Sequence, residues 1–296
     1  MLTSSYSKEK RCLNRVRQSA FWKDGKVIVN PVDKKNFQEA SDEAFQKNQI
    51  WYINLDFYKC CFGLEEEDRI EIIEILRNAR TNEIASNFPD FVFDYGFIEH
   101  FQISSSKLSR KGAAHTKKMM EFKAGIKKDV EKTKAECKES LQIQNTSDKY
   151  WTINNPEHTY EFLKGSFKTH WEKHIRSLEA YSGNKDCGIF MIEYTDMALE
   201  MFENIYSDWK NGMSQGDMRA AERILDYRLS RDKAMLEYIY GYRDQIKYVV
   251  FVYSSGVEVI RVENIPYITN LLPCQYTVIA KNVKHIVSNK MVIKNT

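Results

Sequence analysis

Residues 88 to 106 of the chain read FPDFVFDYGFIEHFQISSS. The stretch contains two apolar-rich runs, Phe91 to Asp94 and Phe97 to Ile103, on either side of the turn-forming pair Tyr95-Gly96. Runs of aromatic and β-branched residues separated by so short a turn are typical of a β-hairpin. We therefore predict a hairpin here, as part of a central β-sheet.

The segments outside the hairpin predict both helices and strands. Leu64 to Asn78 has apolar residues near helical spacing and acidic residues in its first turn, where the helix dipole favours them. CGIFMIEYTD, which begins at Cys187, is a short apolar run of the kind found in strands that are buried on both faces. We therefore expect a mixed α/β protein with a mixed central sheet.

The remaining elements are assigned from the same patterns. Helices are expected from Lys111 to Leu141, after Pro156, from Ala198 to Trp209 and from Asp217 to Tyr242. Strands are expected near Val27, in YVVFVYSSGVEVIRV from Tyr248 and in YTVIA from Tyr276, and a loop is expected from Gln144. These assignments give an N-terminal extension over residues 1–63 and an α/β domain over residues 64–296, with a helical insertion around residues 111–182 and additional C-terminal strands.

Composition limits the class of protein. The chain has 296 residues, of which 43% are hydrophobic and 13% aromatic, enough for a packed interior. Its six cysteines include no CxxC pair and no secretory apolar segment is present near Met1, so we expect a cytoplasmic protein. No run approaches the roughly 18 apolar residues of a membrane helix.

Positive charge is concentrated directly after the predicted hairpin. From Lys107 to Lys138 there are eleven Lys and Arg against four Asp and Glu, in a chain whose net charge is only +3. A basic helix can neutralise phosphates, although such a run is also common on a solvated helix face. DNA or RNA is therefore the expected partner, and no membrane contact is expected.

Two carboxylates are the candidates for chemistry. Asp90 opens the first strand of the hairpin and Glu99 lies in the second, so the hairpin should bring both to one end of the sheet. Carboxylate oxygens hold Mg²⁺, and a divalent ion that bridges a phosphodiester polarises the phosphoryl group and activates water. The pair points to hydrolysis of nucleic acid.

A helix followed by a hairpin that carries Pro89-Asp90 and Glu99 resembles the PD-(D/E)XK superfamily, the restriction endonuclease-like nucleases. The resemblance covers roughly Leu64 to Ile103 and, more loosely, the next helix and strand. It implies a restriction endonuclease-like sheet, a nuclease that uses Mg²⁺ or Mn²⁺, and bacterial genome defence as a setting. It also implies that Asp90 and Glu99 bind the metal, with Glu71 or Glu74 from the preceding helix as a further ligand.

The sequence departs from that family at one position. The family places a lysine two residues after the glutamate, whereas this chain has Phe101 there. The candidate substitutes are Gln102, Lys107 and Lys111, although strand alternation points Gln102 to the face opposite Glu99. The departure keeps a second interpretation open, a non-catalytic module that retains the fold and binds nucleic acid or protein. A homodimer or a partner protein is compatible with both.

Other polar groups have ordinary structural explanations. His170 and His174 have i, i+4 spacing but lack the glutamate of a zinc-protease HExxH helix, so a packed or solvated helix face is expected. The serines from Ser104 to Ser106 indicate a loop, with phosphate contact as the alternative. His100 alternates away from Glu99, and the segment from Tyr227 to Lys233 is expected to be an ion-paired helical surface.

Overall fold

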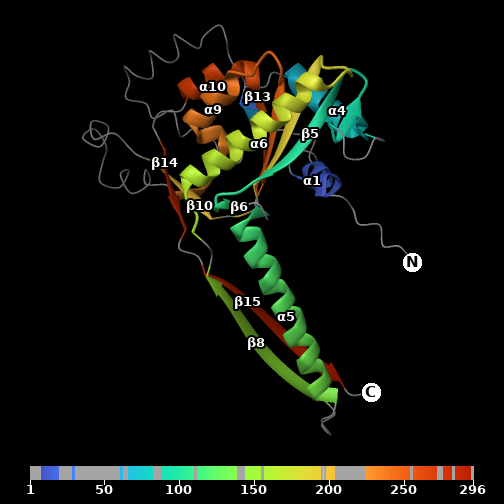
Figure 1. Ribbon diagram of the computed structural model, residues 1–296, viewed down its shortest axis with the longest axis vertical. Helices are drawn as coiled ribbons and strands as arrows, with labels where there is room; N and C mark the ends of the chain where they lie inside the picture. The colour runs from blue at the N-terminus through green and yellow to red at the C-terminus, as the bar shows by residue number, and fades with distance from the viewer. Residues whose placement is uncertain are drawn as a thin grey trace, which may run out of the picture.

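The computed structural model describes residues 8–19, 29–30, 61–62, 66–82, 88–109, 112–138, 144–154, 157–194, 196, 198–203, 224–253, 256–271, 276–281 and 284–294. These residues form a mixed α/β structure, as predicted, around an eight-stranded sheet in the order β1-β2-β13-β12-β9-β5-β4-β3, with helices on both faces (Figure 1). None of the helices in this described part has the length and apolar character needed to cross a membrane.

The centre of the main sheet is parallel. β9 (Cys187–Tyr194) lies between β5 (Gly96–Ile103) and β12 (Tyr248–Tyr253) and runs parallel to both. Every β9 residue except Glu193 is buried, which confirms the prediction of a strand covered on both faces.

Antiparallel strands flank this centre on both sides. The predicted hairpin is β4 (Phe91–Phe93) with β5, and the strands predicted from Tyr248 are β12 and β13 (Gly256–Arg261). The sheet is completed by two-residue strands, namely β3 (Arg80–Thr81) beside β4, β2 (Cys61–Phe62) beside β13, and β1 (Val29–Asn30) beside β2.

The helices divide the core into two layers. One face of the sheet is covered by α6 (Tyr160–Ala180), α9 (Lys233–Tyr240) and α10 (Ile265–Leu271), and the other by α1 (Lys8–Arg17) and α4 (Glu66–Asn78). Because side chains alternate along a strand, Phe97 and Phe101 of β5 enter the α6 layer, whereas Ile98 enters the layer of α1 and α4. The two faces of β5 therefore meet different helices.

Within residues 1–63, which were expected to form an N-terminal extension, α1 packs against the main sheet. Its buried side chains Cys12, Leu13 and Val16 join the same apolar cluster as Ile72 and Ile75 of α4. The amphipathic spacing of these three residues is the physical reason, because the helix can bury one face only by packing against the sheet.

An arm extends away from the main sheet (Figure 1). It consists of α5 (Ala114–Lys138) and an antiparallel ribbon of β8 (Gln144–Asn154) and β15 (Lys284–Lys294). The indole Nε1 of Trp151 on β8 donates to Asp129 of α5 at 3.0 Å. The helix was predicted, but the loop from Gln144 was wrong, because the strand that pairs with this segment follows it by more than a hundred residues.

A smaller sheet corrects two further helix predictions. β10 (Leu199–Glu203) pairs with β11 (Ile224–Asp226) and with β14 (Tyr276–Ala280), the last of which was predicted. The helix predictions from Ala198 and from Asp217 were therefore wrong for Leu199–Glu203 and Ile224–Asp226, and α9 confirms part of the second. Residues 204–223 of these predictions lie outside the described residues. The short elements that remain are β6 (Leu108–Ser109) paired with β7 (Gly112–Ala113), and the 3₁₀ turns η2 (Leu229–Arg231) and η3 (Val262–Asn264).

The segment from Tyr227 to Lys233 is mostly interior, which corrects its assignment to a helical surface. Arg228 Nε donates to Glu258 Oε1 at 2.8 Å, and the Ser230 hydroxyl donates to the same oxygen at 2.6 Å. Glu258 is fully buried on β13. Its carboxylate needs these partners because an unpaired charge in the interior is costly.

Candidate functional site

The strand register of the hairpin brings Asp90 and Glu99 together. β4 and β5 pair Phe91 with Ile98, so the residues one step further, Asp90 and Glu99, lie opposite each other. The Asp90 amide donates to Glu99 Oε2 at 3.0 Å, and the His100 amide donates to Asp90 Oδ2 at 2.8 Å. The two carboxylates therefore share one end of the hairpin.

A histidine from α6 completes this cluster. His174 Nδ1 lies 2.7 Å from Glu99 Oε1, and the His174 ring stacks on Phe101 with centroids 4.9 Å apart. Glu99 is only 6% exposed, so its carboxylate depends on these contacts. His170, one helical turn earlier, has its Nδ1 2.7 Å from the Ser166 carbonyl oxygen and does not share the Glu99 contact.

The electrostatics of the pair raise the pKa of Asp90 to about 6, first through burial and then through the negative charge of Glu99. The hydrogen bond from the His100 amide acts in the opposite direction. Two carboxylates held this close repel each other, and a divalent cation between them would relieve the repulsion. The hard oxygen donors of Asp90 and Glu99 suit Mg²⁺ or Mn²⁺.

The position of the absent family lysine is filled by the core. Phe101 is 4% exposed and contacts the rings of Phe167, Trp171 and Phe190 edge-on. An ammonium group at this point of β5 would be surrounded by aromatic carbon. His174 is the cation-capable side chain that stands beside Glu99 instead.

The proposed substitutes for that lysine do not gather at Glu99. Gln102 points to the opposite face, as alternation predicts, and donates to Glu193 Oε2 at 2.6 Å. Lys107 is exposed four residues beyond the end of β5, and Lys111 lies outside the described residues. Sequence spacing alone could not choose among these three residues, because spacing does not say which side chains fold back toward Glu99.

The carboxylates of α4 lie at the other end of the hairpin. Glu71 accepts hydrogen bonds from Tyr95 at 3.4 Å and Tyr248 at 2.6 Å, and Glu74 is an exposed residue whose charge raises the pKa of Tyr95. Tyr95 is in the turn that precedes β5, four residues before Glu99, so this end is about 13 Å along the strand from Glu99. Neither glutamate joins the Asp90–Glu99 cluster.

A second group of candidate ligands lies on the opposite face of β5. Cys12, His100 and Glu193 each offer a ligand atom, and these three atoms lie within 4.8 Å of one another. His100 Nε2 is 3.3 Å from Glu193 Oε2. This arrangement can hold a metal ion, and sequence reasoning missed it because α1, β5 and β9 supply one ligand each.

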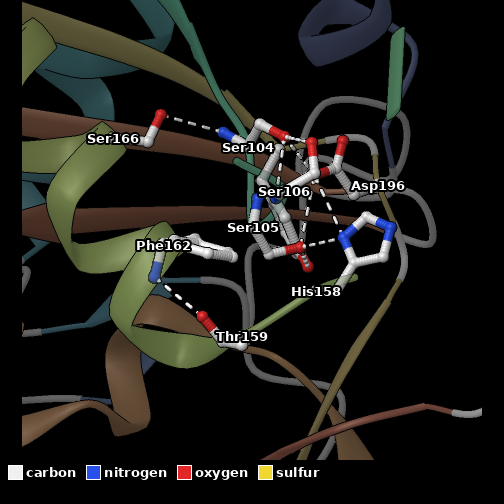
Figure 2. Close-up of polar contacts among 9 residues, drawn as sticks. Ser104, Ser105, Ser106, His158, Thr159, Phe162, Ser166 and Asp196 are labelled. Atoms are coloured by element: carbon white, nitrogen blue, oxygen red, sulfur yellow. Dashed lines mark hydrogen bonds and ion pairs between the residues drawn. The ribbon is translucent and has the colours of Figure 1, made fainter. Parts of the chain in front are cut away.

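The serine run at the end of β5 is a buried polar cluster (Figure 2). Ser104 donates from its hydroxyl to Asp196 at 2.6 Å, and Ser105 donates from its amide to the same carboxylate at 2.7 Å. The Ser105 hydroxyl also lies 2.8 Å from His158 Nδ1. The run lies beyond the end of β5, as the loop interpretation predicts. Ser105 and Ser106 have no exposed surface, however, so their hydroxyls face the interior and not a bound phosphate.

The serine cluster does not have the geometry of a hydrolytic triad. In such a triad one imidazole nitrogen contacts the serine and the other contacts the carboxylate. Here both Ser105 and Asp196 face the same nitrogen of His158, the latter at 3.7 Å (Figure 2). The cluster instead ties the end of β5 to the start of α6, where the Thr159 amide donates to the Ser105 carbonyl at 2.9 Å.

Comparisons with protein-family models, with curated proteins and with solved structures return no match. Function therefore has to be argued from the chemistry of the site, since the same fold can support unrelated activities.

Proposed function

We propose that this protein is a metal-dependent phosphodiesterase of the restriction endonuclease-like type, which hydrolyses DNA or RNA. Asp90 and Glu99 are the ligands of Mg²⁺ or Mn²⁺ in this proposal. The observation that carries it is their opposed placement on β4 and β5, with the Asp90 amide bonded to the Glu99 carboxylate at 3.0 Å.

The elements around the hairpin support the same proposal. α4 precedes the hairpin, with the two-residue β3 between them. After the hairpin come β6, β7, α5 and β8, and then α6 and β9, which is parallel to β5. The PD-(D/E)XK pattern likewise places a helix before a hairpin that carries Pro-Asp and then Glu. A helix before the hairpin, together with Asp90 and Glu99 at the expected positions on it, is stronger support for the proposal than the short sequence motif alone.

A divalent ion bound there would polarise a phosphodiester and lower the pKa of its bound water. The residues of the chain position that chemistry. His174, 2.7 Å from Glu99, fixes the orientation of the carboxylate and supplies a proton-carrying group where the family has a lysine. The His100 amide of β5 donates to Asp90 Oδ2 at 2.8 Å, and this hydrogen bond holds the second carboxylate in place.

The positive charge of Lys107 and of α5 supports nucleic acid as the substrate. Lys107 is exposed and lies between the end of β5 and the start of β6. α5 of the arm contains eight lysines against four acidic residues. Phosphate contacts of this kind give binding that weakens steeply with salt.

A second candidate function is binding without cleavage, and Phe101 is the observation that favours it. Its ring is packed in the core where the family has a lysine, and Glu99 is nearly buried beside it. A carboxylate so enclosed, with both oxygens already bonded, can serve as a structural partner of His174. The module would then bind nucleic acid through the basic arm.

The test is cleavage of single- and double-stranded DNA and RNA by the full chain with Mg²⁺, Mn²⁺ or EDTA. Glu99→Gln is compared with Glu74→Gln, a matched change at a carboxylate that lies away from the cluster. Cleavage that EDTA and Glu99→Gln abolish and Glu74→Gln preserves supports the enzyme. Salt-sensitive binding with no cleavage under any metal supports the binding module and overturns the nuclease proposal.

A further inference from the structure

We infer that Cys12, His100 and Glu193 form a second metal site, of the zinc class, on the face of β5 opposite the Asp90–Glu99 pair. The site joins three elements that are distant in the sequence, namely α1, β5 and β9. It goes beyond the proposed nuclease function, because none of its three ligands is a ligand in that proposal.

The geometry is close to that of a coordinated ion. The three ligand atoms lie within 4.8 Å of one another, and His100 Nε2 and Glu193 Oε2 are 3.3 Å apart. Ligands of tetrahedral zinc are roughly 3.5 Å from each other, given metal–ligand distances of about 2.0 to 2.3 Å. Side-chain adjustments of about an ångström are enough to close the cluster around one ion.

The surroundings of the cluster are unusual for three such groups. Cys12 is 1% exposed and His100 is 7% exposed, in a layer otherwise filled by residues such as Ile98 and Met191. Burial, followed by the charge of Glu193, raises the pKa of the Cys12 thiol. A bound cation would act in the opposite direction on the thiol, because it stabilises the thiolate, and the thiol proton is released to water.

Neighbouring side chains hold the carboxylate in place. Burial acts to raise the pKa of Glu193, but hydrogen bonds from His100 and Gln102 outweigh it and leave the pKa below its usual value. The Arg15 guanidinium adds a positive charge that acts in the same direction. Gln102 Nε2 donates to Glu193 Oε2 at 2.6 Å and orients the carboxylate in the manner of outer-shell partners in metal sites.

The donor set identifies the class of metal. A thiolate with an imidazole and a carboxylate suits zinc and similar borderline ions, whereas Mg²⁺ and Ca²⁺ select oxygen ligands. Three protein ligands leave a fourth position for water. Since Cys12 lies on α1 and the other two ligands lie on the sheet, the bound ion would fasten α1 to β5 and β9.

The experiment uses the full chain, stripped with EDTA, reloaded with Zn²⁺, dialysed and measured by elemental analysis. Co²⁺ replacement adds a thiolate-to-cobalt charge-transfer absorption that reports the cysteine directly. Cys12→Ser is the test variant and Cys187→Ser its matched control, because both are free, buried cysteines in the same apolar layer.

We expect one equivalent of zinc in the wild type and in Cys187→Ser, and a loss of zinc affinity of at least about tenfold in Cys12→Ser. Zinc should also raise the melting temperature of the first two proteins only. Equal zinc content in both variants, or no charge-transfer band in the cobalt protein, would overturn the site. Because the cobalt spectrum is measured on the wild type, the test holds even where Cys12→Ser fails to fold.

The variant Glu99→Gln tests the zinc site and the nuclease proposal independently of each other. That variant should keep its zinc and its cobalt spectrum while it loses cleavage. Retained zinc with no cleavage in any variant would contradict only the proposed function, and retained cleavage without stoichiometric zinc would contradict only this inference.

Discussion

The two faces of β5 each carry a pairing of a carboxylate with an imidazole, but in different surroundings. Glu99 is buried, whereas Glu193 is half-buried. On the α6 face Glu99 contacts His174 at 2.7 Å, beside the stacked ring of Phe101 and the second carboxylate of Asp90. On the α1 face His100 contacts Glu193 at 3.3 Å, beside the thiol of Cys12.

The neighbours of each pair decide its chemistry. A second carboxylate makes the α6 face a cluster of hard oxygen donors, where burial and then the negative charge of Glu99 raise the pKa of Asp90. A thiol and an amide make the α1 face a mixed donor set in which the pKa of Glu193 is lowered. One strand thus presents two different candidate metal sites, one side chain apart.

The largest expected effect is a loss of stability when a core side chain between α6 and the sheet is truncated. Trp171 is fully buried and contacts Phe190 and Tyr242 edge-on, so Trp171→Ala should lower the free energy of unfolding by about 3 to 5 kcal/mol. Urea unfolding measures the change, with the exposed Lys173→Ala of the same helix as the control. A loss below about 1 kcal/mol would contradict the packing of α6 on this face.

The pH dependence of stability should have opposite signs on the two faces, measured in EDTA. The folded pKa of Asp90, about 6, exceeds its ordinary value of 3.8, so the folded state binds the proton more tightly. The contribution of Asp90 is therefore present at low pH and is lost as pH rises through about 6. Glu193, whose pKa is lowered, contributes stability at neutral pH that is lost as pH falls through its folded value.

Two substitutions test this sign difference. Asp90→Asn should stabilise the metal-free protein at neutral pH by about 1 to 3 kcal/mol. It should also remove the fall in the free energy of unfolding that the wild type shows as pH rises through about 6. Glu193→Gln should destabilise the metal-free protein at neutral pH and reduce the fall in the free energy of unfolding at acid pH. Urea midpoints across a pH series measure both, and equal slopes for the two variants would contradict the contrast.

The smallest expected effect concerns the amide that orients Glu193. Gln102 is exposed, and its Nε2 donates to Glu193 Oε2 at 2.6 Å. Gln102→Ala should lower the free energy of unfolding by about 0.5 to 1.5 kcal/mol, the net value of a typical hydrogen bond, because water competes for this exposed side chain. Chemical denaturation measures it, beside Lys107→Ala as an exposed control. No change beyond the control would show that solvent replaces this hydrogen bond.

Local sequence was sufficient for the hairpin, for α4 and for β9. The turn is short and lies at Asp94-Tyr95, one residue earlier than predicted. The mainly apolar run of β9 requires cover on both faces. Local sequence was misleading for β8 and β10. Each pairs with a strand that lies far along the chain, and such pairing overrides local propensity.

The sequence by itself determined that Asp90 and Glu99 meet, because a short hairpin fixes the register between its strands. Alternation also placed Gln102 and His100 on the face away from Glu99. The tertiary structure alone decided that His174 is the partner of Glu99, that α4 directs Glu71 to the far end of the hairpin, and that Cys12 meets His100 and Glu193. These contacts depend on how helices pack across the sheet, and the sum of many weak apolar contacts that sets this packing has no short-range signature in the chain.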